Sequence, residues 1–235
     1  MERQFREWIA DADLVLIGVG KEFEEETFRV KEEALQALNN LAGILEKKNY
    51  FAITICTNDI LKASRMQSDR VVQPCGTVAW KQCINRCNEG LMQLTEEEGN
   101  ALQEKLTLEN TAQPEGLYLG KCPICGSPLV LNTVYTENYD ENGYLKDWNR
   151  YTKWLQGTVN KKLVILELGV DLTYPSIIRW PFEKVAFYNQ KARFVRVNKR
   201  LYHMSEEIKD KGVSIAENAV QWLLKEEETD CDSNH

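Results

Sequence analysis

Short, continuous apolar runs alternate along the chain with segments whose apolar residues recur at helical spacing. Four runs predict buried strands, because a strand covered on both faces is apolar at nearly every position. These runs are residues 14–17, 51–56, 162–168 and 192–197. Helical spacing predicts helices at residues 1–13, 29–48, 95–106, 147–157 and 213–224, and Pro175 favours the start of a further helical turn. This alternation is typical of a parallel α/β sheet.

Two close pairs of cysteines interrupt the alternation in the middle of the chain. Cys83 and Cys87 form the first pair, and Cys122 and Cys125, followed by Gly126, form the second. Tetrahedral zinc bound by four thiolates needs two such pairs brought together by the fold. Because four thiolates leave no position for water, this zinc would be structural. Four unrelated buried thiols are the alternative interpretation.

Composition and charge narrow the possible partners. The 235 residues carry a net charge of −7, which disfavours a general nucleic-acid binder. Basic residues do cluster at 191–200, but they alternate with apolar residues, as at the edge of a sheet. No apolar run approaches the roughly 20 residues of a membrane helix, and the start of the chain lacks the apolar core of a signal peptide. Seven cysteines in such a chain favour a reducing compartment, so we expect a cytoplasmic protein without a membrane partner.

Polar residues and glycines follow four of the predicted strands. Ligands of open parallel sheets bind beyond the carboxyl ends of the strands, so these residues form a candidate site. Gly18 and Gly20 would let the backbone approach a pyrophosphate at the start of a following helix, although a tight turn is the alternative. Arg29 would neutralise phosphate, or would simply be a solvated residue. Asn58 or Asp59 would bind a ribose hydroxyl or an amide, or would simply form a turn. The other residues at strand ends are Val19, Gly169, Val170, Asp171 and Asn198, the last of which either binds ribose or purine or ends its strand.

The order of these features resembles that of the sirtuins, which are NAD-dependent protein deacylases and ADP-ribosyltransferases. The family order is GAG with a following Phe-Arg, TQNID, a His-Gly pair, two cysteine pairs, GTSL and a strand ending in Asn. The corresponding positions are Gly18-Val19-Gly20, Phe28-Arg29, Cys56-Thr57-Asn58-Asp59, Cys75-Gly76, the four cysteines, Gly169-Val170-Asp171-Leu172 and Asn198. The resemblance covers nearly the whole chain.

The resemblance implies a Rossmann-like parallel α/β sheet that binds NAD, with an inserted four-cysteine zinc module. We place the Rossmann-like domain at residues 1–75 and 136–235 and the insert at residues 76–135. The implied catalytic residues are Asn58, Asp59 and Cys75. The implied cofactor-binding residues are Gly18, Val19, Gly20, Phe28, Arg29, Asn58, Gly169, Val170, Asp171 and Asn198.

Departures from the family pattern concern the chemistry. Cys75 replaces the His that acts as general base on the nicotinamide ribose, and a thiol with a pKa near 8.5 is a poor substitute. Thr57 replaces the Gln of TQNID, and Lys21 and Glu22 replace small residues that face the cofactor. The family's small helical module is missing, and residues 133–138 replace the strand that pairs with the acyl-lysine peptide.

Three functions follow, of which the sequence favours the first. In the first, the protein cleaves NAD and transfers ADP-ribose to a protein side chain or to water. Asn58 would then hold the nicotinamide ribose or the attacking water, and Asp59 or Glu22 would supply negative charge. In the second, it is a non-catalytic NAD or ADP-ribose-binding regulator or scaffold. In the third, it is a lysine deacylase whose base is Cys75 or the substrate itself. Both enzymatic functions imply a protein substrate.

Overall fold

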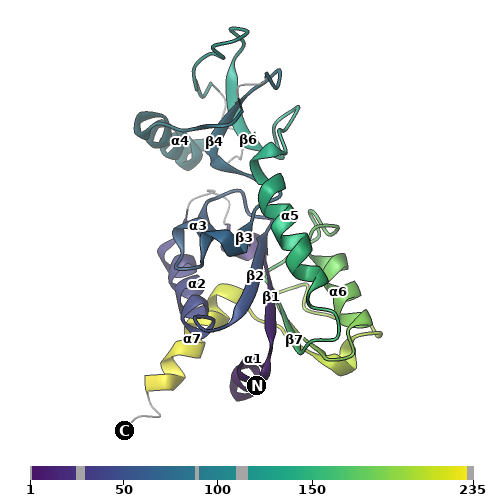
Figure 1. The fold of residues 1–235 in the computed structure, drawn as a ribbon. Helices are drawn as coiled ribbons and strands as arrows, with labels where there is room; N and C mark the ends of the chain where they lie inside the picture. Colours follow the sequence, from purple (N-terminus) through teal and green to yellow (C-terminus); the bar gives the residue numbers. More distant parts are fainter. Residues whose placement is uncertain (1, 25–29, 88–89, 110–115, 232–235) are drawn as a thin grey trace.

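A computed structural model describes residues 2–24, 30–87, 90–109 and 116–231 of the chain. The described part contains a large α/β portion and, at one end of the molecule, a smaller portion around β4, β6 and α4 (Figure 1). α5 runs along the large portion and begins next to the smaller one, so it links the two (Figure 1).

Six parallel strands form the main sheet, in the order β3-β2-β1-β7-β8-β9. Their bounds are β1 Leu14–Val19, β2 Asn49–Thr54, β3 Val71–Val72, β7 Leu163–Leu168, β8 Ala192–Val197 and β9 Gly212–Ile215. Leu14 lies opposite both Asn49 of β2 and Leu163 of β7, so β1 is a central strand. The chain order reverses direction across the sheet between β1 and β7, which makes this pair the topological switch point. The predicted parallel α/β sheet is confirmed.

Helices cover both faces of this sheet, because side chains of a buried strand alternate between its faces. The first face is covered by α1 (Glu2–Asp11), α2 (Glu32–Ile44) and α7 (Ala219–Cys231). Val15 and Ile17 of β1 pack there against Leu38 and Trp222. The second face is covered by α5 (Asn142–Gln156) and α6 (Arg179–Tyr188), whose Tyr151 and Phe182 pack with Leu14 and Leu16. The short helix α3 (Ile60–Ala63) follows β2.

The smaller portion has a sheet of its own with the order β5-β4-β6, in which the strands are antiparallel. Its elements are β4 Gly76–Cys83, β5 Met92–Gln93, β6 Leu129–Thr133 and the helix α4 Glu96–Glu109. Val78, Leu102, Leu106 and Leu131 form its separate apolar core. These elements lie within residues 76–135, and the division of the chain into two domains at those positions stays a prediction.

Three sequence expectations need correction. Residues 213–215 belong to β9 and not to the last helix, because Val213 and Ile215 pair with β8 and the helix begins only at Ala219. Pro175 does not start a helix, since α6 begins at Arg179. The segment directly after β1 and Gly20 is a 3-10 turn and not a long helix. It is the first of three 3-10 turns among the described residues. They are η1 Lys21–Phe23, η2 Ser68–Arg70 and η3 Lys209–Lys211.

Gly18 of β1 packs closely against the start of α6. A Cβ at this position would lie 2.5 Å from Cγ2 of Ile178 and 2.8 Å from Cε2 of Phe182. Gly18→Ala should therefore lower the free energy of unfolding by about 1–3 kcal/mol through overpacking. Gly43→Ala is the matched control, because no heavy atom of the described chain lies within 4 Å of its added Cβ in α2. We expect that control to raise the free energy by up to about 1 kcal/mol. Urea unfolding of both variants checks this, and an equal change in both would contradict the packing role of Gly18.

Candidate functional site

The candidate site lies at the carboxyl edge of the main sheet, where the segments after β1 and β7 meet. The N–H of Gly20 donates to the carbonyl of Leu168 at 2.8 Å. A Cβ on Gly20 would lie 2.3 Å from Cα of Val170, so a glycine is needed for this contact. Gly169 has a φ of +63°, a conformation that also favours glycine. Of the two glycines predicted to admit a pyrophosphate, Gly20 thus brings the two strand-end segments against each other, whereas Gly18 packs on Ile178 and Phe182.

A buried carboxylate, that of Glu24, organises the β2 side of this edge. It accepts hydrogen bonds from the hydroxyl of Thr57 at 2.7 Å and from the N–H of Asn58 at 2.7 Å. It also accepts the N–H of Thr57 and forms an ion pair with the ammonium of Lys21. Glu24 therefore fixes the position of the segment after β2, in which two of the predicted site residues lie.

Lys21 completes a partly buried ion pair at the centre of the edge. Burial by itself would lower the pKa of Lys21, but the carboxylate of Glu24 outweighs it and raises that pKa above its usual value. The ammonium also donates to the hydroxyl of Tyr135, in the segment between β6 and α5, at 3.1 Å. The ion pair thus joins the ends of β1 and β2 to the segment that follows the smaller sheet.

Both buried thiols at this edge are weak acids. Burial raises the pKa of Cys75 to about 12, so its thiol stays protonated at neutral pH. Cys56 is fully buried, donates through Sγ to the carbonyl of Gly20 at 3.1 Å, and has its pKa raised by burial as well. Neither thiol has the acidity of a catalytic cysteine or the basicity of an imidazole at neutral pH.

Asn58 and Asp59 line one cavity of about 390 Å³ between the two portions of the chain, together with Val78 and Leu102 of the smaller portion. Asn58 is 1% exposed, and its side-chain N–H donates to the carbonyl of Phe23 at 3.3 Å. Asp59 accepts the hydroxyl of Thr77 at 2.6 Å. Both residues therefore line a cavity between the two portions, and their role in binding a ribose stays a prediction.

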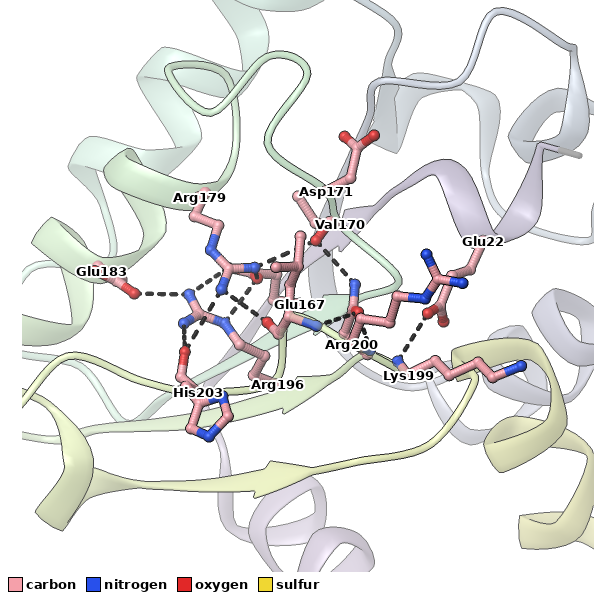
Figure 2. Close-up of polar contacts among 12 residues, drawn as sticks. Glu22, Glu167, Val170, Asp171, Arg179, Glu183, Arg196, Lys199, Arg200 and His203 are labelled. Atoms are coloured by element: carbon pink, nitrogen blue, oxygen red, sulfur yellow. Dashed lines mark hydrogen bonds and ion pairs between the residues drawn. The ribbon is translucent and has the colours of Figure 1, made fainter. Parts of the chain in front are cut away.

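Two further contacts define the β8 side of the edge. The side-chain amide of Asn198 donates to the carbonyl of Val170 at 3.0 Å and accepts the N–H groups of Arg200 and Leu201 at 2.8 and 2.7 Å. The carboxylate of Glu22 accepts the N–H of Lys199 at 2.8 Å (Figure 2). Asn198 therefore shapes the loop after β8 and links it to the segment after β7.

A buried ion network beneath this edge holds the same loops (Figure 2). Glu167 of β7 accepts two hydrogen bonds from Arg196 of β8, at 2.7 and 2.9 Å, and one from Arg179 of α6 at 3.1 Å. Burial raises the pKa of Glu167, and the Arg196 guanidinium opposes this shift. The guanidiniums also donate to the carbonyls of Leu201 at 2.7 Å and His203 at 2.6 Å. Residues 191–200 are thus not a sheet edge as predicted, because β8 pairs with β7 and β9 and Arg196 is 1% exposed.

The four cysteines Cys83, Cys87, Cys122 and Cys125 gather in the smaller portion, with all four sulfurs within 4.8 Å of one another. Sγ of Cys83 lies 3.7 Å from that of Cys87 and 3.6 Å from that of Cys125. Four sulfurs about 2.3 Å from a tetrahedral zinc would be separated by about 3.8 Å, so the donor set fits this ion. Gly126, directly after the second cysteine pair, has a φ of +72°, a conformation that favours glycine.

Sequence reasoning missed several residues that shape the site. Glu24 lies in the acidic run 22–26, which looks like a solvated surface segment and gives no sign of burial. Glu167 did leave a signal, because a single carboxylate in a strongly apolar strand needs a buried partner. Phe28 and Arg29, predicted to contact the cofactor, lie outside the described residues.

Comparisons with known proteins place this fold. No protein-family model matches the chain. A Staphylococcus aureus protein ADP-ribosyltransferase is 21% identical over 180 residues, 76% of this chain and 56% of that protein. A probable bifunctional ADP-ribose hydrolase/ADP-ribosyltransferase of Fusarium oxysporum f. sp. cubense is 24% identical over 153 residues, 63% of this chain and 25% of that protein. The chain therefore spans about half the length of the first relative and a quarter of the second.

Solved sirtuin structures match nearly the whole chain. A Sir2 homologue in complex with NAD superposes with a TM-score of 0.61 at 12% identity, covering 99% of this chain and 95% of that one. Sir2 bound to an acetylated peptide gives 0.60 at 15% identity, covering 98% and 99%. The predicted resemblance is confirmed, and the chain has the sirtuin fold. Among the described residues, no helix has both the length and the apolar character needed to cross a membrane.

A Sir2 homologue with this fold is solved in complex with NAD, and the residues at the carboxyl edge of our chain fit such a cofactor only in part. Gly20 lies against the main chain of Gly169 and Val170 at the switch point between β1 and β7, so no side chain intervenes there. However, the carboxylate of Glu22 already accepts the N–H groups of Lys199 and Ala219, which would face an anionic ligand. A dinucleotide phosphate does not fit against those groups while Glu22 stays in place.

Arg196 tests whether the buried network supports the site. Arg196→Met leaves the carboxylate of Glu167 buried without its bidentate partner, and we expect a loss of about 3–5 kcal/mol in the free energy of unfolding. The control is the double variant Glu167→Leu, Arg196→Met, which removes both charges and should be more stable than the single variant. Chemical denaturation of the three proteins provides the comparison. A double variant less stable than the single one would mean that the network does not act through charge pairing.

Proposed function

We propose that this chain acts as a sirtuin-like, NAD-dependent protein-modifying protein that cleaves NAD and transfers ADP-ribose to a protein side chain. The observation that carries the proposal is a coincidence of two likenesses. The sirtuin fold extends over nearly the whole chain, and the two curated relatives that match 76% and 63% of it are named for ADP-ribose chemistry. Sirtuin structures with bound peptides support a protein as the substrate.

The state of Cys75 supports ADP-ribose transfer over deacylation. In the family pattern, a His at this position acts as general base on the nicotinamide ribose. Cys75 is buried with a pKa raised to about 12, so at neutral pH it holds its proton and accepts none. We therefore propose that the site does not use this position as a base. Asn58 remains the proposed contact to the nicotinamide ribose, and Gly18–Gly20 and Gly169–Asp171 remain the proposed contacts to the rest of NAD.

A non-catalytic NAD or ADP-ribose-binding regulator is the second candidate. The observation that favours it is the state of Glu24, the buried carboxylate at the end of β2. Its oxygens already accept hydrogen bonds from Lys21, Thr57 and Asn58, so it is held in place by donors rather than presented to a ligand. Together with a protonated Cys75, this arrangement favours binding without turnover.

For the four-cysteine cluster, we propose a structural zinc ion. Sulfur separations near those of tetrahedral zinc and the absence of a free ligand position in a four-thiolate site support this role. The cluster lies in the smaller portion, away from the edge of the main sheet, which is consistent with a folding role (Figure 1). We also propose a reducing, cytoplasmic location, which the six free cysteines among the described residues support.

Metal content checks the zinc proposal. Protein purified without chelator should contain about one zinc per chain, and Cys122→Ser should lower this content and destabilise the smaller portion, because three thiolates bind zinc less tightly than four. Cys231→Ser, which changes a cysteine outside the cluster, should leave the zinc content unchanged. Elemental analysis by mass spectrometry gives the metal content. A metal-free protein that is folded throughout would contradict the proposal.

Nicotinamide release from NAD checks the reaction. We expect release without an acyl-lysine peptide, together with transfer of label from biotinylated NAD to protein. Asn58→Ala should lower the release rate by about a hundredfold, because it removes a polar contact to the reacting ribose. The melting temperature of the same variant separates lost chemistry from lost folding.

Other outcomes of this assay point elsewhere. Release that requires an acyl-lysine peptide would contradict ADP-ribose transfer and support a deacylase. If no nicotinamide appears while NAD or ADP-ribose raises the melting temperature, the binding regulator replaces the enzyme.

A further inference from the structure

Glu22 connects three segments that lie far apart in the sequence. Its Oε1 accepts the N–H of Lys199, directly after β8, at 2.8 Å. Its Oε2 accepts the N–H of Ala219, the first residue of α7, at 2.6 Å. Its Cβ packs on Gly169, where an added Cβ would lie 2.5 Å away. Both oxygens of one carboxylate are thus used at the strand edge, as Figure 2 shows for the contact to Lys199.

The groups around this carboxylate suit an anion. α7 is a helix of 13 residues, and its first N–H groups carry the positive end of the helix dipole. The other N–H, that of Lys199, comes from the loop after β8, in which Lys199 and Arg200 are exposed and positively charged. The cradle lies at the carboxyl ends of β1, β7 and β8, beside the switch point where open α/β sheets bind their ligands. A side chain of the protein therefore occupies a position with the properties of a phosphate site.

The neighbouring residues hold the main chain around Glu22 in place. Lys21 and Glu24, on either side of Glu22 in the sequence, form the ion pair that ties η1 to the segment after β2. Displacing Glu22 therefore means moving its side chain while η1 stays attached. A ligand anion would have to replace two hydrogen bonds to a charged group, and such bonds are stronger than those between neutral groups.

We propose that the Glu22 carboxylate competes with the anionic groups of a nucleotide for the N–H groups of Lys199 and Ala219. Nucleotide binding displaces Glu22, so this residue sets the affinity of the edge for phosphate-bearing ligands. The inference rests on the proposed nucleotide site and goes beyond it, since it assigns to Glu22 the role of an internal competitor. A ligand without phosphate, such as adenosine, does not meet this competition.

Calorimetric titration of Glu22 variants with ADP-ribose and with adenosine tests the proposal. Glu22→Ser, which removes the carboxylate, should bind ADP-ribose about tenfold more tightly than the unaltered protein, while the affinity for adenosine changes by less than about twofold. Glu22→Gln should give a smaller gain, since its amide still reaches the N–H groups without a charge. The matched control is Glu217→Gln, which removes a negative charge close to the start of α7. The carboxylate of Glu217 pairs with Lys225 and not with the N–H groups that Glu22 holds. This control variant should change neither affinity by more than about twofold.

Each result decides a separate question. Tighter ADP-ribose binding by Glu22→Ser, with a lower melting temperature in the absence of ligand, supports the competition. If the contact were purely structural, its loss would lower both the affinity for ADP-ribose and the melting temperature. Unchanged or weaker ADP-ribose binding by the variant, when the unaltered protein binds ADP-ribose, overturns the inference and leaves the proposed nucleotide site intact. ADP-ribose binding by Glu22→Ser, when the unaltered protein does not bind it, supports both the competition and the proposed nucleotide site. If neither protein binds ADP-ribose or NAD, the proposed nucleotide site is wrong and the inference falls with it.

Discussion

The carboxyl edge of the main sheet depends on a buried charge, that of Glu167 near the carboxyl end of β7. Arg196 and Arg179 neutralise it, and their remaining N–H groups reach the carbonyls of the loops after β7 and β8. Removing a carboxylate from water costs several kcal/mol, which only well-placed partners recover, so the two guanidiniums are confined to one geometry. The loops that they hold are therefore confined as well. Through these loops the interior of the sheet determines where Asn198 and the N–H of Lys199 lie.

Neighbouring glutamates of this chain have different partners in the fold, and the local sequence does not distinguish them. Glu22 and Glu24 belong to the same acidic run and lie two residues apart. One carboxylate faces the end of β8 and the start of α7, whereas the other faces the end of β2. Both are fixed by main-chain N–H groups from segments that are distant in sequence. A pattern of charges along the chain contains no information about such partners. Neither the burial of Glu24 nor the two main-chain partners of Glu22 could therefore be predicted before the fold was known.

The sequence predicted the parts of the fold that depend on continuous or periodic apolar residues. β8 was predicted with its observed bounds, and β1, β2 and β7 were predicted within a few residues. β9 was missed because it has only four residues, pairs on one side, and precedes a helix with a similar apolar content. At the candidate site, the cysteine cluster was predicted fully, since ligand spacing is a local property. Gly18 and Gly20 were predicted to let the backbone approach a pyrophosphate, but only tertiary contacts show that Ile178 approaches the first and Val170 the second.

The contact between Glu22 and the start of α7 also gives the protein an optical property. Trp222 lies one turn into that helix, is 4% exposed, and packs edge-on against Phe5 of α1 with ring centroids 4.9 Å apart. The main-chain N–H of Trp222 donates to the carbonyl of Asn218, the residue before Ala219. The first N–H groups of α7 therefore lie within one helical turn of an indole in an apolar environment. We expect a rearrangement of those groups to change the fluorescence of Trp222, one of the six tryptophans of the chain.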